Sequence, residues 1–470
     1  MKFLRIRLLE NHSFIFFLLF LPIIFNFVLN YFSKPVLETF NKFNYFDFFS
    51  SILLFYFLLN IGISIKTNLN LPYISTGIVI YFLSYFVIDS LILFFYENLT
   101  FNNLFFLINI LWFFLIALSR KNRVSLLKIS ITYFALNVFN NIFYINLTKN
   151  KNVIGDVKDI HYDHVSNIYQ NSYFYSVNNP TLEGYPQITA YFQAVLNRIS
   201  ISLDEFQHLS SSINVLYFLV ILLIFEIDIR KSSKYYLATI LTALIYNSEW
   251  LKLIFVDSLM TEGMLNYLFC SLILSGIKYL NSPNYNAPII FFSLGLLYLC
   301  KQFISLLALI SIIMFFLLIK DKFYALFGLS GIILKQLSHL FYFENLTINY
   351  HLKEIDLVDT FFDLILLRDL KLENISLIIK NLYLDKPTSL VFFLFFLITG
   401  VYYFKNGFLS KEINTLVTII LINFLFVFIL YVSIWRNMEL ESPIRYMHNL
   451  MFLILITEFK IIETFEINKN

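Results

Sequence analysis

The chain is 470 residues long, with 59% hydrophobic, 19% aromatic and only 14% charged residues, and its formal net charge is +3. Soluble proteins carry about a quarter charged residues and just under half apolar ones, so this composition excludes an ordinary water-soluble protein. The small net charge gives no reason to expect a nucleic-acid partner. We predict an all-α, polytopic membrane protein whose partners include membrane lipids.

Apolar stretches long enough to cross a bilayer recur along most of the chain. A spanning helix needs about 20 such residues, and on this criterion we count about 14 helices, with about 12 to 14 as the range. The stretches are 13–32, 48–66, 73–96, 103–119, 128–147, 212–228, 235–250, 263–280, 286–300, 303–319, 323–342, 390–405, 413–434 and 447–464.

Lysine and arginine set the predicted orientation, because they gather in the cytoplasmic connections of membrane proteins. With the N-terminus in the cytoplasm, most basic residues of the short loops fall inside. Those inner residues are Arg120, Lys121, Arg123, Lys128, Arg230, Lys231, Lys234, Lys320, Lys322, Lys405 and Lys411. Both termini are therefore predicted to be cytoplasmic, and two long segments, 148–211 and 343–389, are predicted to lie on the extracytoplasmic side.

This orientation divides the chain into three groups of predicted spans, 1–147, 212–342 and 390–470, which the two outer segments separate. Each outer segment contains apolar residues at helical spacing, in QITAYFQAVLNRI (187–199) and in FFDLILLRDL (361–370). We predict that both stretches are amphipathic helices that lie on the membrane surface.

The most unusual polar stretch is GDVKDIHYDHVSN (155–167), which follows the fifth predicted span. If it is helical, Asp159 and Asp163 stand four residues apart on one face, where like charges repel. One of the two would then have a shifted pKa or a cationic partner. A solvated loop without a role explains the stretch equally well. His161 and His164 could hold a metal with these aspartates, but loop histidines are more often solvated, so we expect no metal and no cofactor.

Three further polar positions fall on the same predicted outer side. Asp257 and Glu262 flank the start of one span, Lys301 separates two apolar runs, and Arg445 and Tyr446 open the last span. Ionisable residues at membrane depth are costly and mark functional sites. For Lys301 and Arg445 the alternative is that their charged ends simply reach back to the interface.

These side chains together suit one kind of chemistry. Carboxylates in outer loops can take a proton from an acceptor hydroxyl or amine. Lysine and arginine at the membrane face can hold a phosphate, arginine as a bidentate fork. A phosphate at the bilayer surface with an apolar tail in the lipid describes a polyprenyl-phosphate sugar. The residues therefore suggest sugar transfer from such a donor to a lipid, glycan or protein acceptor on the outer side.

The order of these elements resembles the GT-C class of integral-membrane glycosyltransferases, which includes dolichyl-phosphate-mannose protein mannosyltransferases and bacterial aminoarabinose transferases. The similar stretches are DIHYDHVSNIYQNSYFYSVNNPTLEGYPQITAYFQAVLNRI, VDSLMTEGMLNYLF, FFSLGLLYLCKQFISLLALI and SPIRYMHNLMFLIL, within residues 150–465. The resemblance implies that Asp163 or Asp159 is the catalytic carboxylate. It also implies that Lys301 and Arg445 bind the donor phosphate.

The same resemblance implies substrate-binding roles for His164, Tyr185, Asp257, Glu262 and Tyr446. We expect an integral protein of a bacterial inner membrane with an extracytoplasmic active site. The chain departs from the family pattern in three ways. The acidic segment follows the fifth span instead of the first. His164 stands where the family commonly has Glu, and Gln302 stands where the family has Pro. These departures leave open the choice between Asp159 and Asp163, and the subfamily.

Two other functions are alternatives to this one. An O-antigen polymerase or ligase also uses lipid-linked glycans, but its outer loops are rich in arginine and 343–389 holds only Arg368. A flippase or transporter of lipid-linked sugars would place its site near the midplane on broken helices. Few Gly or Pro residues interrupt the predicted spans, and Lys335 is the clearest charge within one. The polar residues favour the membrane rim, and therefore an enzyme.

Overall fold

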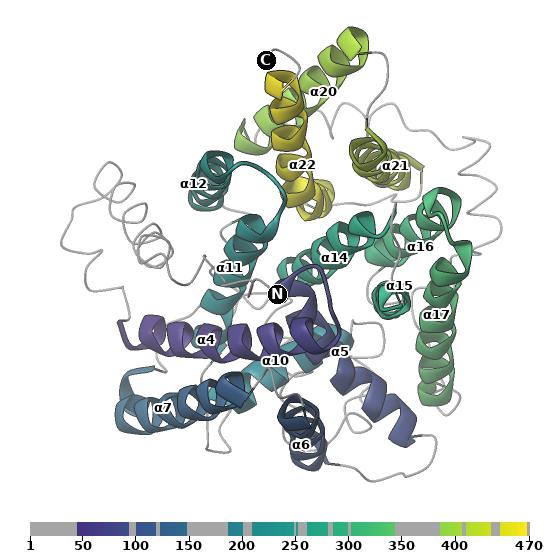
Figure 1. The fold of residues 1–470 in the computed structure, drawn as a ribbon. Coiled ribbons are helices and arrows are strands. Elements are labelled where there is room, and N and C mark those ends of the chain that lie inside the picture. Colours follow the sequence, from purple (N-terminus) through teal and green to yellow (C-terminus); the bar gives the residue numbers. More distant parts are fainter. Residues whose placement is uncertain are drawn as a thin grey trace.

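The structure, a computed structural model, describes residues 45–93, 100–118, 123–147, 187–200, 209–248, 251, 261–280, 285–298, 302–343, 386–406, 410–433 and 442–467. In these ranges every regular element is an α-helix and no strand is present (Figure 1). The helices are α4 (Tyr45–Asn68), α5 (Ile74–Leu93), α6 (Phe101–Leu118), α7 (Arg123–Leu147), α10 (Gln187–Ser200), α11 (Leu209–Glu226), α12 (Lys231–Asn247), α14 (Thr261–Lys278), α15 (Ala287–Leu296), α16 (Gln302–Leu318), α17 (Lys322–Phe343), α20 (Lys386–Asn406), α21 (Lys411–Ser433) and α22 (Ser442–Ile467).

The all-α prediction is confirmed for the described residues. Each apolar stretch predicted from 48–66 onward coincides with one helix, and the first stretch, 13–32, lies outside the described residues. Three helical stretches are long and apolar enough to cross a membrane, namely Phe48–Asn68, Ile74–Ile92 and Phe101–Leu118.

The surface of the helices carries large apolar side chains, as expected for contact with lipid. Phe114 on α6, Phe134 on α7 and Phe404 on α20 are 62%, 70% and 89% exposed, and many leucines and isoleucines on these helices are exposed beside them. A water-soluble monomer rarely exposes apolar patches of more than a few hundred Å². This surface and the three long apolar helices both point to a membrane protein.

Helices α4, α5 and α7 pack together at one side of the molecule (Figure 1). The rings of Phe49 and Phe139 lie 6.4 Å apart and those of Phe57 and Tyr133 lie 5.8 Å apart, so α4 and α7 run antiparallel. A short turn, in which Asn70 has a φ of 46°, then reverses the chain from α4 into α5. α5 therefore begins where α4 ends, and α7 runs toward the start of α4.

Polar side chains join α5 to α6 inside this apolar surrounding. The Tyr81 hydroxyl donates to Oδ1 of Asn109 at 2.9 Å, and the Asn109 amide donates to the Tyr85 hydroxyl at 2.8 Å. One turn further along α6, Trp112 Nε1 donates to the Ser84 hydroxyl at 3.1 Å. Hydrogen bonds of this kind hold membrane helices together, because contacts between apolar side chains are no more favourable there than contacts with lipid.

The structure confirms the predicted helix at 187–199 but corrects its expected position. This helix, α10, packs against α5, α7 and α11, and its Phe192 ring stacks on Phe82 at 3.9 Å. A helix on a membrane surface keeps its polar face in water. In α10, however, Thr189 and Gln193 on the polar face are buried together with the apolar face. The other predicted amphipathic helix, 361–370, lies outside the described residues.

Glycines set the closest helix contact in the described structure, between α15 and α17. A Cβ atom added at Gly295 would overlap the Gly328 carbonyl oxygen and come within 2.9 Å of the Ile332 backbone nitrogen. A Cβ at Gly331 would likewise overlap the Phe292 carbonyl oxygen. Because the obstacles are backbone atoms, no side chain can rotate away, and a larger residue must push the helices apart.

We therefore expect Gly295→Ala to lower the free energy of unfolding by about 2 kcal/mol, the usual cost of overpacking. Gly400→Ala in α20 is the matched control, because no atom lies within 4 Å of its added Cβ. There the better helix propensity of alanine should leave stability unchanged or raise it by up to about 1 kcal/mol. Reversible unfolding in mixed micelles measures both variants, and equal stabilities would contradict the α15–α17 contact.

Candidate functional site

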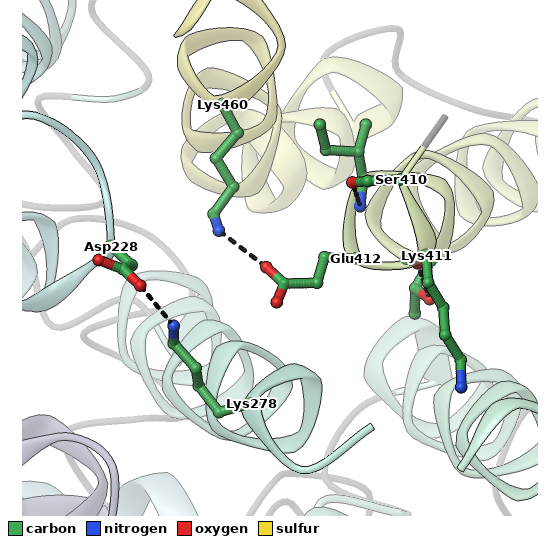
Figure 2. A network of polar contacts seen from close by, with 8 residues as sticks. Asp228, Lys278, Ser410, Lys411, Glu412 and Lys460 are labelled. Carbon is green, nitrogen blue, oxygen red and sulfur yellow. Dashed lines mark hydrogen bonds and ion pairs between the residues drawn. The ribbon is translucent and has the colours of Figure 1, made fainter. Parts of the chain in front are cut away.

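Charged side chains from several helices gather at one end of the helices, which we call the ionic end. Lys278 Nζ on α14 lies 2.8 Å from Asp228 Oδ2, and Lys460 Nζ on α22 lies 3.4 Å from Glu412 Oε2 on α21 (Figure 2). The Lys278 hydrogen bond and charge hold the pKa of Asp228 below its usual value, and Lys460 contributes from further away. The C-terminal parts of α14 and α22 therefore lie at the same end.

The first turn of α5 is capped at the ionic end by Glu226, the last residue of α11. The Glu226 carboxylate accepts hydrogen bonds from the Ile74 N–H, from the Ser75 N–H at 2.8 Å and from the Ser75 hydroxyl at 2.6 Å. The first N–H groups of a helix have no partner within the helix, and a negative charge there is favoured by the helix dipole. Glu226 thus holds α5 and α11 together.

The contacts at the ionic end are explained by structure alone. Asp228 is 79% exposed, so its pair with Lys278 is a surface salt bridge of small energetic value. Among the described residues, no group of three or more His, Cys, Asp or Glu side chains is placed to hold a metal. A catalytic role is better sought at the opposite end.

A buried polar group, which we call the Asp89 cluster, lies about 21 Å along α5 from Ser75, at the usual helical rise. The Tyr191 hydroxyl on α10 donates to Asp89 Oδ2, and the Tyr191 ring lies edge-on to Phe86 at 6.4 Å. Lys335 Nζ on α17 lies over the same Phe86 ring, 4.3 Å from its centroid. All four side chains are at most 5% exposed. Three helices thus bring a carboxylate, a phenol and an ammonium group together.

Burying these charged groups costs free energy. Each ion loses several kcal/mol of hydration free energy, which contacts inside the protein only partly replace. Tyr191 donates a hydrogen bond to Asp89, and the aromatic face under Lys335 supplies about 2 kcal/mol at most. Apolar side chains of similar volume would fill the same space at lower cost. Ionisable residues inside membrane proteins are for this reason functional candidates.

Two helices that carry predicted site residues begin far from the ionic end. Glu262 is the second residue of α14, about 24 Å along the helix from Lys278. Arg445 and Tyr446 lie in the first turns of α22, and Arg445 is about 22 Å from Lys460. The helix backbones thus place these three positions away from the ionic end, while the directions of their side chains lie outside the described structure.

The remaining predicted site residues lie outside the described residues: Asp159, Asp163, His164, Tyr185, Asp257 and Lys301. The described helices on either side of 148–186 are nevertheless informative. Leu147 ends α7, which runs toward the start of α4, and Gln187 begins α10 one turn before Tyr191. The chain therefore re-enters the described structure beside the Asp89 cluster.

Sequence reasoning missed two members of the cluster and undervalued a third. Asp89 is the single acidic residue in α5, in the run FVIDSLILFF, so an ionisable residue in an apolar helix was a usable signal. Tyr191 gave no signal, because the chain has 31 tyrosines. Lys335 was noticed as a charge within a span, but its neighbours on α5 could not be read from one sequence.

Comparisons with protein-family models, with curated proteins and with solved structures found no match for this chain. The resemblance of its motifs to GT-C enzymes therefore stays a prediction. Support for a function has to come from the chemistry of the residues themselves and from the ends of the helices at which they lie.

Proposed function

We propose that the protein is an integral-membrane glycosyltransferase that moves a sugar from a polyprenyl-phosphate donor to a lipid, glycan or protein acceptor. In this proposal the helices beyond the three long apolar ones also cross the membrane, and both termini are cytoplasmic. The site lies on the extracytoplasmic side of a bacterial inner membrane. It takes 148–211 as the catalytic segment, as the resemblance to GT-C enzymes implies.

One observation carries the proposal. Glu262 and Arg445 lie at helix starts, about 24 Å and 22 Å along α14 and α22 from Lys278 and Lys460 of the ionic end. An enzyme with a lipid-linked donor needs carboxylates, a cation for the phosphate and an acceptor site at one membrane face. Two predicted site positions at helix starts away from the ionic end are consistent with such a site, and this supports the proposal.

The proposed reaction is a single displacement at the anomeric carbon of the sugar. Asp163 or Asp159 takes the proton from the acceptor hydroxyl or amine as that atom forms a bond to the anomeric carbon. The bond between this carbon and the phosphate oxygen breaks, and the polyprenyl phosphate leaves with the electron pair. Lys301 and Arg445 stabilise the charge on the leaving phosphate. A single displacement inverts the configuration of the sugar.

The other predicted residues surround this reaction. His164, Tyr185, Asp257, Glu262 and Tyr446 bind the sugar or the acceptor in the proposal. The Asp89 cluster contains a further buried carboxylate and a buried cation. The reaction needs no metal, since the cations that face the phosphate are side chains of the chain itself.

A transporter of lipid-linked sugars is the second candidate, and the buried positions of Asp89 and Lys335 favour it. Ionisable side chains within a helix bundle also mark ion and substrate pathways. Unlike the transferase, a transporter would move the lipid-linked sugar across the membrane without cleaving it.

An assay of purified protein in liposomes separates the two functions. Liposomes would carry a panel of lipid-linked sugars and an acceptor mixture, and the assay would measure released polyprenyl phosphate and transbilayer movement of intact donor. We expect release of polyprenyl phosphate and a product with inverted anomeric configuration. Movement of intact donor without cleavage would favour the transporter, and neither release nor movement across the whole panel would contradict both.

A further inference from the structure

Six exposed lysines occupy the ionic end of the described helices, and we call them the lysine belt. Lys231 follows the loop that carries Asp228, Lys411 precedes Glu412, and Lys405 Nζ lies 5.4 Å from the Phe465 ring on α22. The complete belt is Lys128, Lys231, Lys320, Lys322, Lys405 and Lys411.

The remaining members lie at the same end because of how their helices run. Lys128 is in the first part of α7, which is antiparallel to α4 and so begins where α4 ends. Lys320 and Lys322 join α16 to α17, and the Phe315 ring on α16 lies against Gly276, two residues before Lys278. These contacts place Lys128, Lys320 and Lys322 on the side of the ionic end.

The lysine belt is not neutralised within the described part of the chain. None of its six members forms an ion pair there, and Lys411 points away from both ion pairs in Figure 2. Two nearby carboxylates already form ion pairs, Asp228 with Lys278 and Glu412 with Lys460. Asp321, between Lys320 and Lys322, and Glu463 accept backbone N–H groups at 3.2 Å and 2.8 Å, so these two carboxylates offset only part of the six positive charges. The positive charge of the belt is therefore available to a partner.

Exposed aromatic rings accompany the lysines. Tyr236 on α12, Phe323 on α17 and Phe404 on α20 are 67%, 62% and 89% exposed, and each lies within five residues of a belt lysine. Aromatic rings of membrane proteins gather at the level of the lipid headgroups, where lysine side chains also reach from the apolar region into water. The combination marks the level at which this end meets the headgroups.

We propose that the lysine belt binds the headgroups of anionic phospholipids. Their phosphates would contact the ammonium groups while their acyl chains cover the exposed apolar faces of α7, α17 and α20. An acidic protein partner would fit the charge but not the apolar side chains directly beside it. The inference concerns the end opposite the proposed active site and does not depend on sugar transfer.

The expected strength follows from the charge alone. A lysine near an anionic membrane surface contributes about 1 kcal/mol at physiological ionic strength, and the effect falls off within about one Debye length. Preference for an anionic over a zwitterionic lipid of equal chain length should therefore rise with the number of belt lysines and decline with added salt.

The test is lipid retention by the full chain purified in nanodiscs made from equal amounts of phosphatidylglycerol and phosphatidylcholine. Native mass spectrometry counts each lipid that stays bound after release from the disc. We expect wild type to keep phosphatidylglycerol preferentially, and replacement of all six belt lysines by glutamine to lower that preference at least about fivefold. Lys278→Gln with Lys460→Gln is the matched control, because these two lysines at the same end are already paired, and it should keep the wild-type preference.

Thermal unfolding in phosphatidylcholine alone shows whether each variant is folded. If the six-lysine variant is unstable, the variants Lys231→Gln with Lys411→Gln and Lys320→Gln with Lys322→Gln give smaller losses of preference that answer the same question. Equal retention of both lipids by wild type, or an unchanged preference in folded belt variants, would overturn the proposal. Stabilisation by soluble polyglutamate but not by phosphatidylglycerol would assign the belt to an acidic protein and overturn it as well.

Discussion

Replacement of both Asp159 and Asp163 by asparagine is expected to lower kcat for sugar transfer by about 10² to 10⁴-fold, the usual contribution of a general base. This corresponds to about 3 to 5 kcal/mol of transition-state stabilisation. Asparagine keeps the size of the side chain but cannot accept the acceptor proton. Because the proposed donor phosphate is held by Lys301 and Arg445, the KM for the donor should change little. Initial rates of polyprenyl-phosphate release at several donor concentrations measure both constants.

The single variants decide which aspartate is the base, a choice that the sequence leaves open. If Asp163 is the base, Asp163→Asn should reproduce nearly the whole loss, and Asp159→Asn should cost far less. Asp228→Asn is the control, since Asp228 is an exposed carboxylate at the opposite end of the molecule. Wild-type turnover in the double variant would rule out both aspartates as the base.

The helices were predictable because apolar side chains alone determine where a chain can cross a bilayer. From 48–66 onward, every predicted stretch coincides with a helix, although α15, at 10 residues, is much shorter than the expected stretch 286–300. The position of α10 was not predictable in the same way. Its alternating polar and apolar residues resemble those of a surface helix, and only the packing of α5, α7 and α11 around it buries Thr189 and Gln193.

The candidate site could be predicted only in part, because it depends on contacts between distant parts of the chain. Motif order drew attention to Glu262 and Arg445, and both positions lie at helix starts away from the ionic end. Asp89 and Tyr191 are 102 residues apart in sequence, and no local pattern relates them. A cluster of charges within one stretch can be recognised from the sequence. A pair of residues on two different helices can be recognised only once the fold is known.

Glu226 gives the largest expected effect on stability. Its carboxylate accepts three hydrogen bonds from the first turn of α5, and Lys66 adds a favourable charge. The alanine variant would leave the Ile74 and Ser75 N–H groups without their acceptor in a partly buried position and would disconnect α11 from α5. Hydrogen bonds to a charged group contribute about 1.5 to 3 kcal/mol each, and water can replace part of that. We expect Glu226→Ala to lower the free energy of unfolding by about 3 kcal/mol or more.

The matched control is Glu412→Ala, the same substitution at the same end of the molecule (Figure 2). The Glu412 side chain is 34% exposed, and its ion pair with Lys460 is 3.4 Å long, so the loss should stay below about 1 kcal/mol. Glu226→Gln keeps one acceptor oxygen and should fall between the two. Reversible unfolding in mixed micelles gives all three values. Similar losses for Glu226→Ala and Glu412→Ala would show that the Glu226 cap is no stronger than a surface ion pair, and that apolar packing alone holds α5 against α11.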